Sequence, residues 1–212
     1  MIETKSISEQ ITEILKQKIL HHEFKPGEKI DTDKLAQEYE VSAMPVRDAL
    51  KKLENRGLVI NRERVGFFVR ELSIEEINEI VEVRLMYEGY CLQKHLDNID
   101  LSRVRALLEE MRSFKNSSRQ KFDKIDKKLH YSIIRASENE FLVQRYKNIE
   151  DLVDLVRHLD KDREEKAMEE HIEITKRILS KKTLEARKLL EDHIKNVRKN
   201  IINQYKNTTG GG

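Results

Sequence analysis

The sequence contains no tryptophan, one cysteine (Cys91), two prolines and seven glycines in 212 residues. A β-sandwich or barrel needs many turn residues, so the scarcity of proline and glycine disfavours both and favours a mainly helical chain. A lone cysteine excludes an intramolecular disulfide and is typical of a reducing compartment. No apolar run approaches the ~20 residues that span a bilayer. The first ten residues hold no apolar signal core, so we expect a cytoplasmic protein without a membrane segment.

Charge is abundant but balanced. Charged residues make up 38% of the chain, yet the formal net charge is only +2 at pH 7. The global charge therefore says little about nucleic acid as a partner. Evidence for such a partner has to come from local clusters of basic residues.

Residues 1–72 predict a small domain of three helices followed by a β-hairpin. Apolar residues at helical spacing, together with capping residues, indicate helices that begin near Ser6, near Asp31 or Thr32, and near Ser42. Two short β-type runs, Leu58–Ile60 and Phe67–Val69, flank residues 61–66 and indicate the hairpin.

Residues 73–206 predict a second, all-helical domain, because strand signals vanish after Leu72. Helical spacing and turn residues indicate six helices, at about 73–96, 100–115, 119–137, 139–160, 163–180 and 183–206. The tail, residues 207–212, ends in three glycines, and we expect it to be disordered. The fold class is thus mainly α with a small β-hairpin.

The first domain carries the basic cluster that a DNA-binding protein needs. In a helix-turn-helix the second helix braces the third, whose N-terminal residues enter the major groove. The candidate DNA-contacting residues lie on the third helix and the hairpin: Ser42, Met44, Arg47, Lys51, Arg62, Arg64 and Gly66. Basic residues there would hold phosphates, which give affinity and register. The alternative is that they are solvated surface charges on a chain with 41 basic residues.

The order and spacing of motifs in residues 6–71 resemble the GntR family of bacterial regulators. The resemblance rests on Lys25-Pro26-Gly27, Lys34-Leu35-Ala36, Val41-Ser42, Pro45-Val46-Arg47-Asp48-Ala49-Leu50, Gly57-Leu58-Val59 and Gly66-Phe67-Phe68-Val69. It implies a winged helix-turn-helix, double-stranded operator DNA as partner, and a homodimer on a two-fold operator. The family usually has Arg-Thr where this chain has Ala43-Met44, so the operator sequence stays open.

Three of the seven histidines in the chain form a suggestive series with one carboxylate. Asp126 and His130 are one helical turn apart and share a helix face, and His171 and His193 lie beside apolar stripes of two later helices. Each histidine alone is more typical of a hydrogen-bonded core residue. Together, three imidazoles and a carboxylate suit a divalent transition metal such as Zn²⁺ or Ni²⁺ in a helical bundle.

The helical half also resembles the FCD effector domain of the FadR subfamily, in its shorter, VanR-like version. That resemblance implies the metal ligands Asp126, His130, His171 and His193, and a metal with open positions where a small carboxylate metabolite binds. Arg84 would supply a second contact to this effector as a forked donor. Its alternative role is an ion pair with Glu88 at i+4.

The leading hypothesis is therefore a ligand-responsive transcription regulator in which a metal helps to anchor a carboxylate effector. The alternative is a regulator whose metal is purely structural or is itself the signal. A metal-dependent hydrolase is disfavoured, because the DNA-binding half would have no role and no general base stands out. We expect no enzymatic activity and no catalytic residues.

Overall fold

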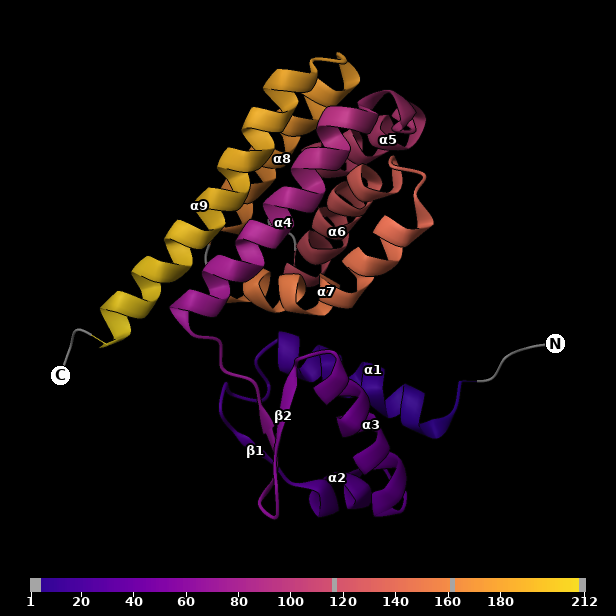
Figure 1. The fold of residues 1–212 in the computed structure, drawn as a ribbon, viewed down its shortest axis with the longest axis vertical. Helices are drawn as coiled ribbons and strands as arrows, with labels where there is room; N and C mark the ends of the chain where they lie inside the picture. Colours follow the sequence, from indigo (N-terminus) through magenta and orange to yellow (C-terminus); the bar gives the residue numbers. More distant parts are fainter. Residues whose placement is uncertain (1–4, 116–117, 161–162, 210–212) are drawn as a thin grey trace. The chain divides into compact units, whose positions relative to one another are not determined.

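The computed structural model of the chain describes residues 5–115, 118–160 and 163–209 (Figure 1). Its internal contacts divide it into two compact units. The first comprises Met1–Ser73 and Asn148–His158, and the second comprises Ile74–Lys147 and Leu159–Gly212. Among the described residues, no helix is long and apolar enough to cross a membrane.

The first unit begins with three helices: α1 (Ile7–Leu20), α2 (Thr32–Glu38) and α3 (Ala43–Asn55). Ser6 and Glu9 form a capping box that starts α1, and the Asp31 carboxylate accepts the backbone N–H groups of residues 33 and 34 to start α2. Gly57 follows α3 with a φ of 75°, a left-handed conformation that glycine adopts without steric cost. The apolar faces of α1 and α3 pack together around Leu15, Leu50 and Leu53, which are fully buried.

The sheet of the first unit has three strands in the described residues, not the two of a simple hairpin. Strands β2 (Val59–Arg62) and β3 (Gly66–Val69) form the predicted antiparallel hairpin, and β1 (Lys29–Ile30) pairs with the other edge of β3. Two residues are too few to show an alternating pattern, so β1 left no sequence signal. The Gly27 N–H donates to the Val69 carbonyl and brings this strand into register.

The second unit is built from helices, with six α-helices in the part of the chain described after residue 72. They are α4 (Ile74–His95), α5 (Leu101–Arg112), α6 (Arg119–Arg135), α7 (Glu140–Leu159), α8 (Glu164–Leu179) and α9 (Thr183–Thr209), with a short 3₁₀ turn at Leu96–Asn98. The segment of α7 from Asn148 to His158 belongs to the first unit.

The predicted helix ends need two corrections. Helix α5 ends at Arg112, before the expected 115, because the chain turns at Ser113 and buries Phe114. Helix α9 continues through Thr209, beyond the expected end at 206, because no glycine interrupts it before Gly210. Residues 207–209 are therefore helical where we expected a disordered tail, and residues 210–212 lie outside the described residues.

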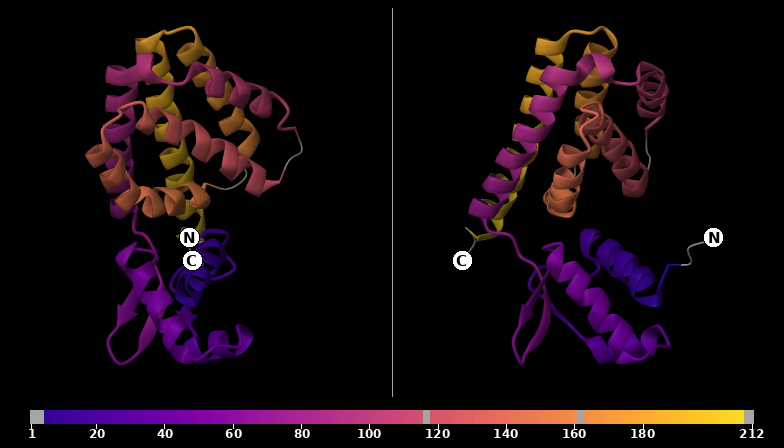
Figure 2. Two further views of the ribbon diagram at one scale, coloured as in Figure 1. Left: turned by 90° about the vertical axis from the view of Figure 1, so that its right-hand side faces the viewer. Right: turned by 45° about the vertical axis from the view of Figure 1, so that its right-hand side comes forward.

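Four helices of the second unit surround one interior. Helix α4 packs along α9, α8 packs on both α6 and α9, and α6 also packs on α4 (Figure 2). Each contributes fully buried aliphatic residues to the core, among them Ile133 on α6, Ile174 on α8 and Ile194 on α9. Polar side chains on these same helices point into this interior.

Candidate metal centre and nucleic-acid interface

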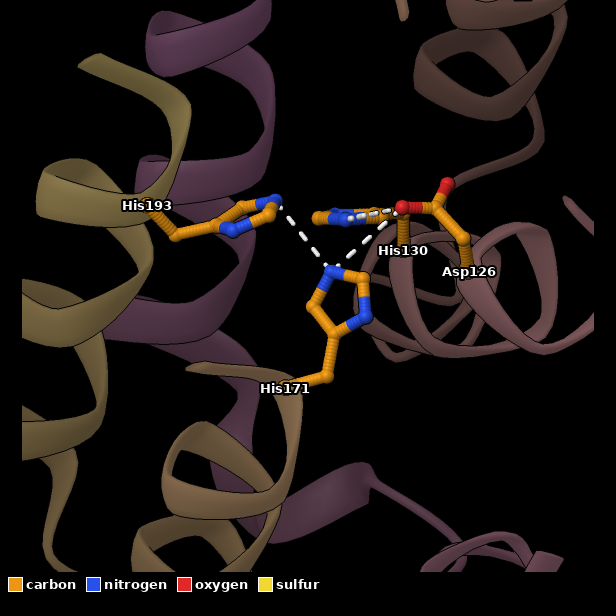
Figure 3. Close-up of side chains that lie close together, drawn as sticks. All are labelled: Asp126, His130, His171 and His193. Atoms are coloured by element: carbon orange, nitrogen blue, oxygen red, sulfur yellow. Dashed lines mark hydrogen bonds and ion pairs between the residues drawn. The ribbon is translucent and has the colours of Figure 1, made fainter. Parts of the chain in front are cut away.

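Four predicted ligands converge in the interior of the second unit (Figure 3). Asp126 and His130 lie one turn apart on α6, His171 lies on α8 and His193 on α9. One ligand atom from each residue lies within 4.8 Å of the others. The Nε2 atoms of His171 and His193 are 3.2 Å apart, and Asp126 Oδ1 lies 3.4 Å from His171 Nε2 and 3.6 Å from His130 Nε2.

All four side chains are buried, with at most 3% of any residue exposed. Gathering three imidazoles and a carboxylate away from water is costly unless hydrogen bonds or a shared ion compensate. The set offers nitrogen and oxygen donors, which are borderline ligands suited to divalent transition metals. The donor chemistry and the spacing of the four atoms therefore fit a metal ion.

Glu170 controls the protonation of His193. The Nδ1–H of His193 donates to Glu170 Oε2 at 2.7 Å, which leaves the lone pair on Nε2, toward the other ligands. Burial lowers the pKa of His193 to about 4, so the ring is neutral at pH 7. Burial raises the pKa of Glu170, but hydrogen bonds from His193 and Arg163 and the positive charge of Arg163 outweigh this and lower it to about 2. An ionised carboxylate thus holds a neutral imidazole in the form that binds metals.

Glu88 plays the corresponding part for His130. The Nδ1–H of His130 donates to Glu88 Oε2 at 2.6 Å, and the Tyr146 hydroxyl donates to Glu88 Oε1 at 3.0 Å. Burial raises the pKa of Glu88, but the Arg84 guanidinium and His130 together hold it well below its ordinary value. Glu88 therefore remains ionised and orients the ring so that Nε2 faces the cluster.

Arg84 forms the i+4 ion pair that was its alternative role, and it also contacts one of the predicted metal ligands. Its Nε donates to Glu88 Oε1 at 2.7 Å in the i+4 pair, and its Nη2 donates to His130 Nε2 at 2.9 Å. The second contact uses the lone pair that His130 would give to a metal. A metal ion bound at this nitrogen would compete with the Arg84 guanidinium for the lone pair.

One face of α3 and its N-cap residue present the predicted DNA-reading residues to solvent. Ser42, Met44, Arg47 and Lys51 are exposed, whereas Val46, Ala49, Leu50 and Leu53 form the buried face. Ser42 is the N-cap residue of α3, and its hydroxyl makes no capping hydrogen bond. The exposed face of α3 and its N-cap therefore carry two cations, the anion Asp48, a hydroxyl and one large apolar side chain.

The wing carries two more exposed cations. The Arg62 guanidinium carbon lies 4.2 Å from the centroid of the Phe68 ring, which fixes its direction on the sheet. Arg64 lies in the turn between β2 and β3 with a φ of 60°, and Gly66 has a φ of 121°, which a residue with a side chain rarely adopts. Arg64 thus lies exposed in the tight turn of the hairpin, and Arg62 lies over the sheet beside it.

A separate groove of about 510 Å³ lies between α5 and α6. Its cations already have partners: Lys128 lies 2.7 Å from Glu110 and Arg103 lies 3.1 Å from Asp100. A carboxylic acid would have to compete with these carboxylates.

Comparison with known families decides the class of this protein. Residues 7–69 match the model of bacterial regulatory proteins of the gntR family, and residues 79–196 match the model of the FCD domain. The chain belongs to the GntR family. It is therefore a DNA-binding transcription regulator with an FCD effector domain, and the expectation that it is not an enzyme is confirmed by its relatives.

Individual relatives agree with this assignment. This GntR regulator is 29% identical to the HTH-type transcriptional regulator YdhC of Bacillus subtilis over 182 residues, covering 82% of this chain and 81% of the relative. It shares its fold with a GntR transcriptional regulator from Rhodococcus sp. RHA1, with a TM-score of 0.79, 21% identity and coverage of 94% and 99%. The Zn²⁺-bound FCD domain of TM0439 is 34% identical, with a TM-score of 0.59 and coverage of 64% and 99%.

The sequence did not predict a role for Glu170, and it predicted for Glu88 only an ion pair with Arg84, not the hydrogen bond to His130. The chain has 39 acidic residues, and only the fold reveals which of them meet the outer nitrogens of the histidines. Glu88 had one signal, its i+4 spacing from Arg84. Glu170 had none, because its partner His193 lies on another helix 23 residues away.

Proposed function

We propose that this GntR regulator responds to a small carboxylate that is anchored by a metal ion in its FCD domain. Asp126, His130, His171 and His193 hold the ion, which we expect to be Zn²⁺ or Ni²⁺. Arg84 supplies the protein's direct contact to the acid. The observation that carries the proposal is the convergence of four buried ligand atoms. Two of the imidazoles, those of His130 and His193, already have the tautomer that binds metals.

The carboxylates that surround the four candidate ligands favour a metal site over a polar core that has only a structural role. A histidine that ligates a metal typically donates its other ring N–H to a carboxylate. Both Glu88 and Glu170 are placed in this way. The zinc-bound FCD domain that is 34% identical to this chain is consistent with the same use here.

Two features support a carboxylate as the effector: the position of Arg84 and the number of protein ligands that the metal would have. A metal that binds all four residues and stays four-coordinate has no position for an effector, as in structural zinc sites. A five- or six-coordinate ion keeps one or two positions open. A carboxylate oxygen in such a position would lie beside the Arg84 guanidinium, whose fork matches the two oxygens of an acid.

On the DNA side, we propose that Ser42, Met44, Arg47 and Lys51 of α3 enter the major groove. Arg62, Arg64 and the turn at Gly66 would contact the adjacent backbone. Two copies of the chain, as a homodimer, would read the two halves of a pseudo-palindromic operator. The effector then acts by binding one arrangement of the two DNA-binding domains more tightly than another.

The alternative is that the metal is structural or is itself the signal. Titration of acids against metal-loaded, full-length protein separates the two views, because a specific ligand raises the melting temperature by mass action. We expect acetate, succinate or gluconate to stabilise the Zn²⁺- or Ni²⁺-loaded protein and to leave the chelated protein unchanged. A large shift with metal and none with any acid would instead support the alternative.

Two substitutions sharpen the experiment. His171→Gln and His193→Gln remove one ligand each, and we expect both to abolish the metal-dependent response to acid. His95→Ala, a half-buried histidine outside the cluster, is the matched control and should respond as the native chain does. A full response in both ligand variants contradicts the proposal.

A further inference from the structure

The first turn of α3 exposes an apolar side chain at the N-terminal end of a stripe of charged residues. Met44 is 72% exposed, more than any other large hydrophobic residue in the described part of the first unit. Counting from Met44, residues 47, 48 and 51 follow at i+3, i+4 and i+7, so all four share one helical face. Arg47, Asp48 and Lys51 are all exposed as well.

A single exposed apolar residue is ordinary on a protein surface. Met44 differs because of where it stands. It is the second residue of α3, at the end of the helix that enters the groove in a helix-turn-helix. Arg47 and Lys51 on the same face would hold phosphates and bring this end of the helix against the base edges.

The chemistry of methionine limits what it can read there. Its side chain has no hydrogen-bond donor and only a weak thioether acceptor, so it cannot use the donor and acceptor pattern that distinguishes guanine, adenine and cytosine. The C5-methyl of thymine is the apolar group on the floor of the major groove. Methionine is also unbranched and flexible, so it can follow the position of such a methyl.

We propose that Met44 reads a thymine methyl group in each half of the operator. The inference rests on the DNA-reading role proposed for α3, and it adds the class of base that this helix selects. Ala43, which is half-buried beside it, also lacks a hydrogen-bonding side chain. Sequence discrimination by hydrogen bonds then falls to Ser42 and Asp48.

The test begins with selection of binding sites from random double-stranded DNA by the full-length protein. In the selected site, each thymine is replaced singly by deoxyuridine, which keeps the base pair and removes only the methyl. We expect one position per half-site where this weakens binding about fourfold, the factor that corresponds to ~0.8 kcal/mol for one buried CH₂ group. The same replacement should leave binding by Met44→Ala unchanged, because the partner of the methyl is gone.

Two further variants make the result unambiguous. Met44→Gln should shift the selected base at this position from thymine to adenine, since glutamine pairs with the N6 and N7 edge of adenine. Met86→Ala removes a methionine that is 60% exposed on α4 and should bind DNA as the native chain does.

Failure of the inference is distinguishable from failure of the DNA-reading role itself. Suppose that Arg47→Ala and Lys51→Ala weaken binding to all sequences, but that no replacement of thymine by deoxyuridine changes the affinity. Then α3 contacts DNA and only the role of Met44 is wrong. If neither cation variant weakens binding, the proposed interface is wrong as well. Unchanged affinity of Met44→Ala for every selected site would indicate that Met44 serves a contact other than DNA and overturns the inference.

Discussion

Replacement of Glu170 by glutamine tests the second layer of the metal site. The carboxylate accepts the Nδ1–H of His193 and is itself held by Arg163 and by the Asn196 amide at 2.9 Å. Glutamine keeps the shape but loses the charge, and its amide can donate to Nδ1. Donation would move the ring proton to Nε2, the atom that has to bind the metal.

The expected loss of metal affinity is about 10- to 100-fold, the usual effect of removing such an outer carboxylate. This corresponds to ~1.4–2.7 kcal/mol. At a zinc concentration of about 100 times the native Kd, zinc stabilises the native protein by ~2.7 kcal/mol. The same concentration would stabilise Glu170→Gln by only ~1.4 kcal/mol for a tenfold loss, or ~0.4 kcal/mol for a hundredfold loss.

The assay is competition between the full-length protein and a chelator of known zinc affinity, with circular dichroism to show that each variant is folded. Glu173→Gln is the matched control, because Glu173 lies on the same helix but pairs with Lys176 at 2.6 Å near the surface. We expect the control to bind zinc as the native chain does. Equal zinc affinity in both variants, within about threefold, would refute the role of Glu170.

Three further predictions follow from particular residues. Arg84→Lys keeps a positive charge beside Glu88 but loses the planar fork. Acid binding to the metal-loaded protein should therefore weaken about tenfold, while the metal affinity changes little. Calorimetric titration measures both affinities, and undiminished acid binding would contradict the role of Arg84. Gly57→Ala forces a side chain into a φ of 75° and should destabilise the first unit by about 1–2 kcal/mol. Gly89→Ala, whose added Cβ meets its nearest atoms only at 3.9 Å, should instead stabilise α4 by about 0.5–1 kcal/mol. Denaturant unfolding should show opposite changes in the free energy of unfolding for the two variants, and changes of the same sign would contradict this prediction. Burial raises the pKa of the Cys91 thiol to about 11, so it stays protonated at pH 8 and should react with a thiol reagent only after unfolding; rapid reaction of the folded protein would contradict this.

Much of the fold was predictable because its signals are local. The stripe on α3 and the left-handed glycine at Gly57 lie within one or two turns of the residues they organise, and the predicted helices are found with small shifts. Strand β1 was not predictable, since its two residues gain their structure only by pairing with β3, far along the chain. Its hydrogen bonds, not its pattern, define it.

The candidate site also combines residues with local sequence signals and contacts that only the fold creates. Asp126 and His130 were identifiable as a pair because i and i+4 share a helix face. His171 and His193 were identifiable as imidazoles beside the apolar stripes of two later helices, and a family resemblance then implied the full set. The contacts of Arg84 with His130 and of Glu170 with His193 join different helices. No spacing rule relates such residues, so the fold alone reveals that two carboxylates set the tautomers of two candidate ligands.

The most direct test of the central claim measures the affinity of the full-length protein for its selected operator with and without acid. The metal-loaded protein should change its affinity by about fivefold or more, the lower end of typical allosteric coupling, when acetate, succinate or gluconate is added. After chelation of the metal, and in His193→Gln, the same acids should have no effect. An equal response to acid without the metal, or no response to any acid with it, would contradict the account.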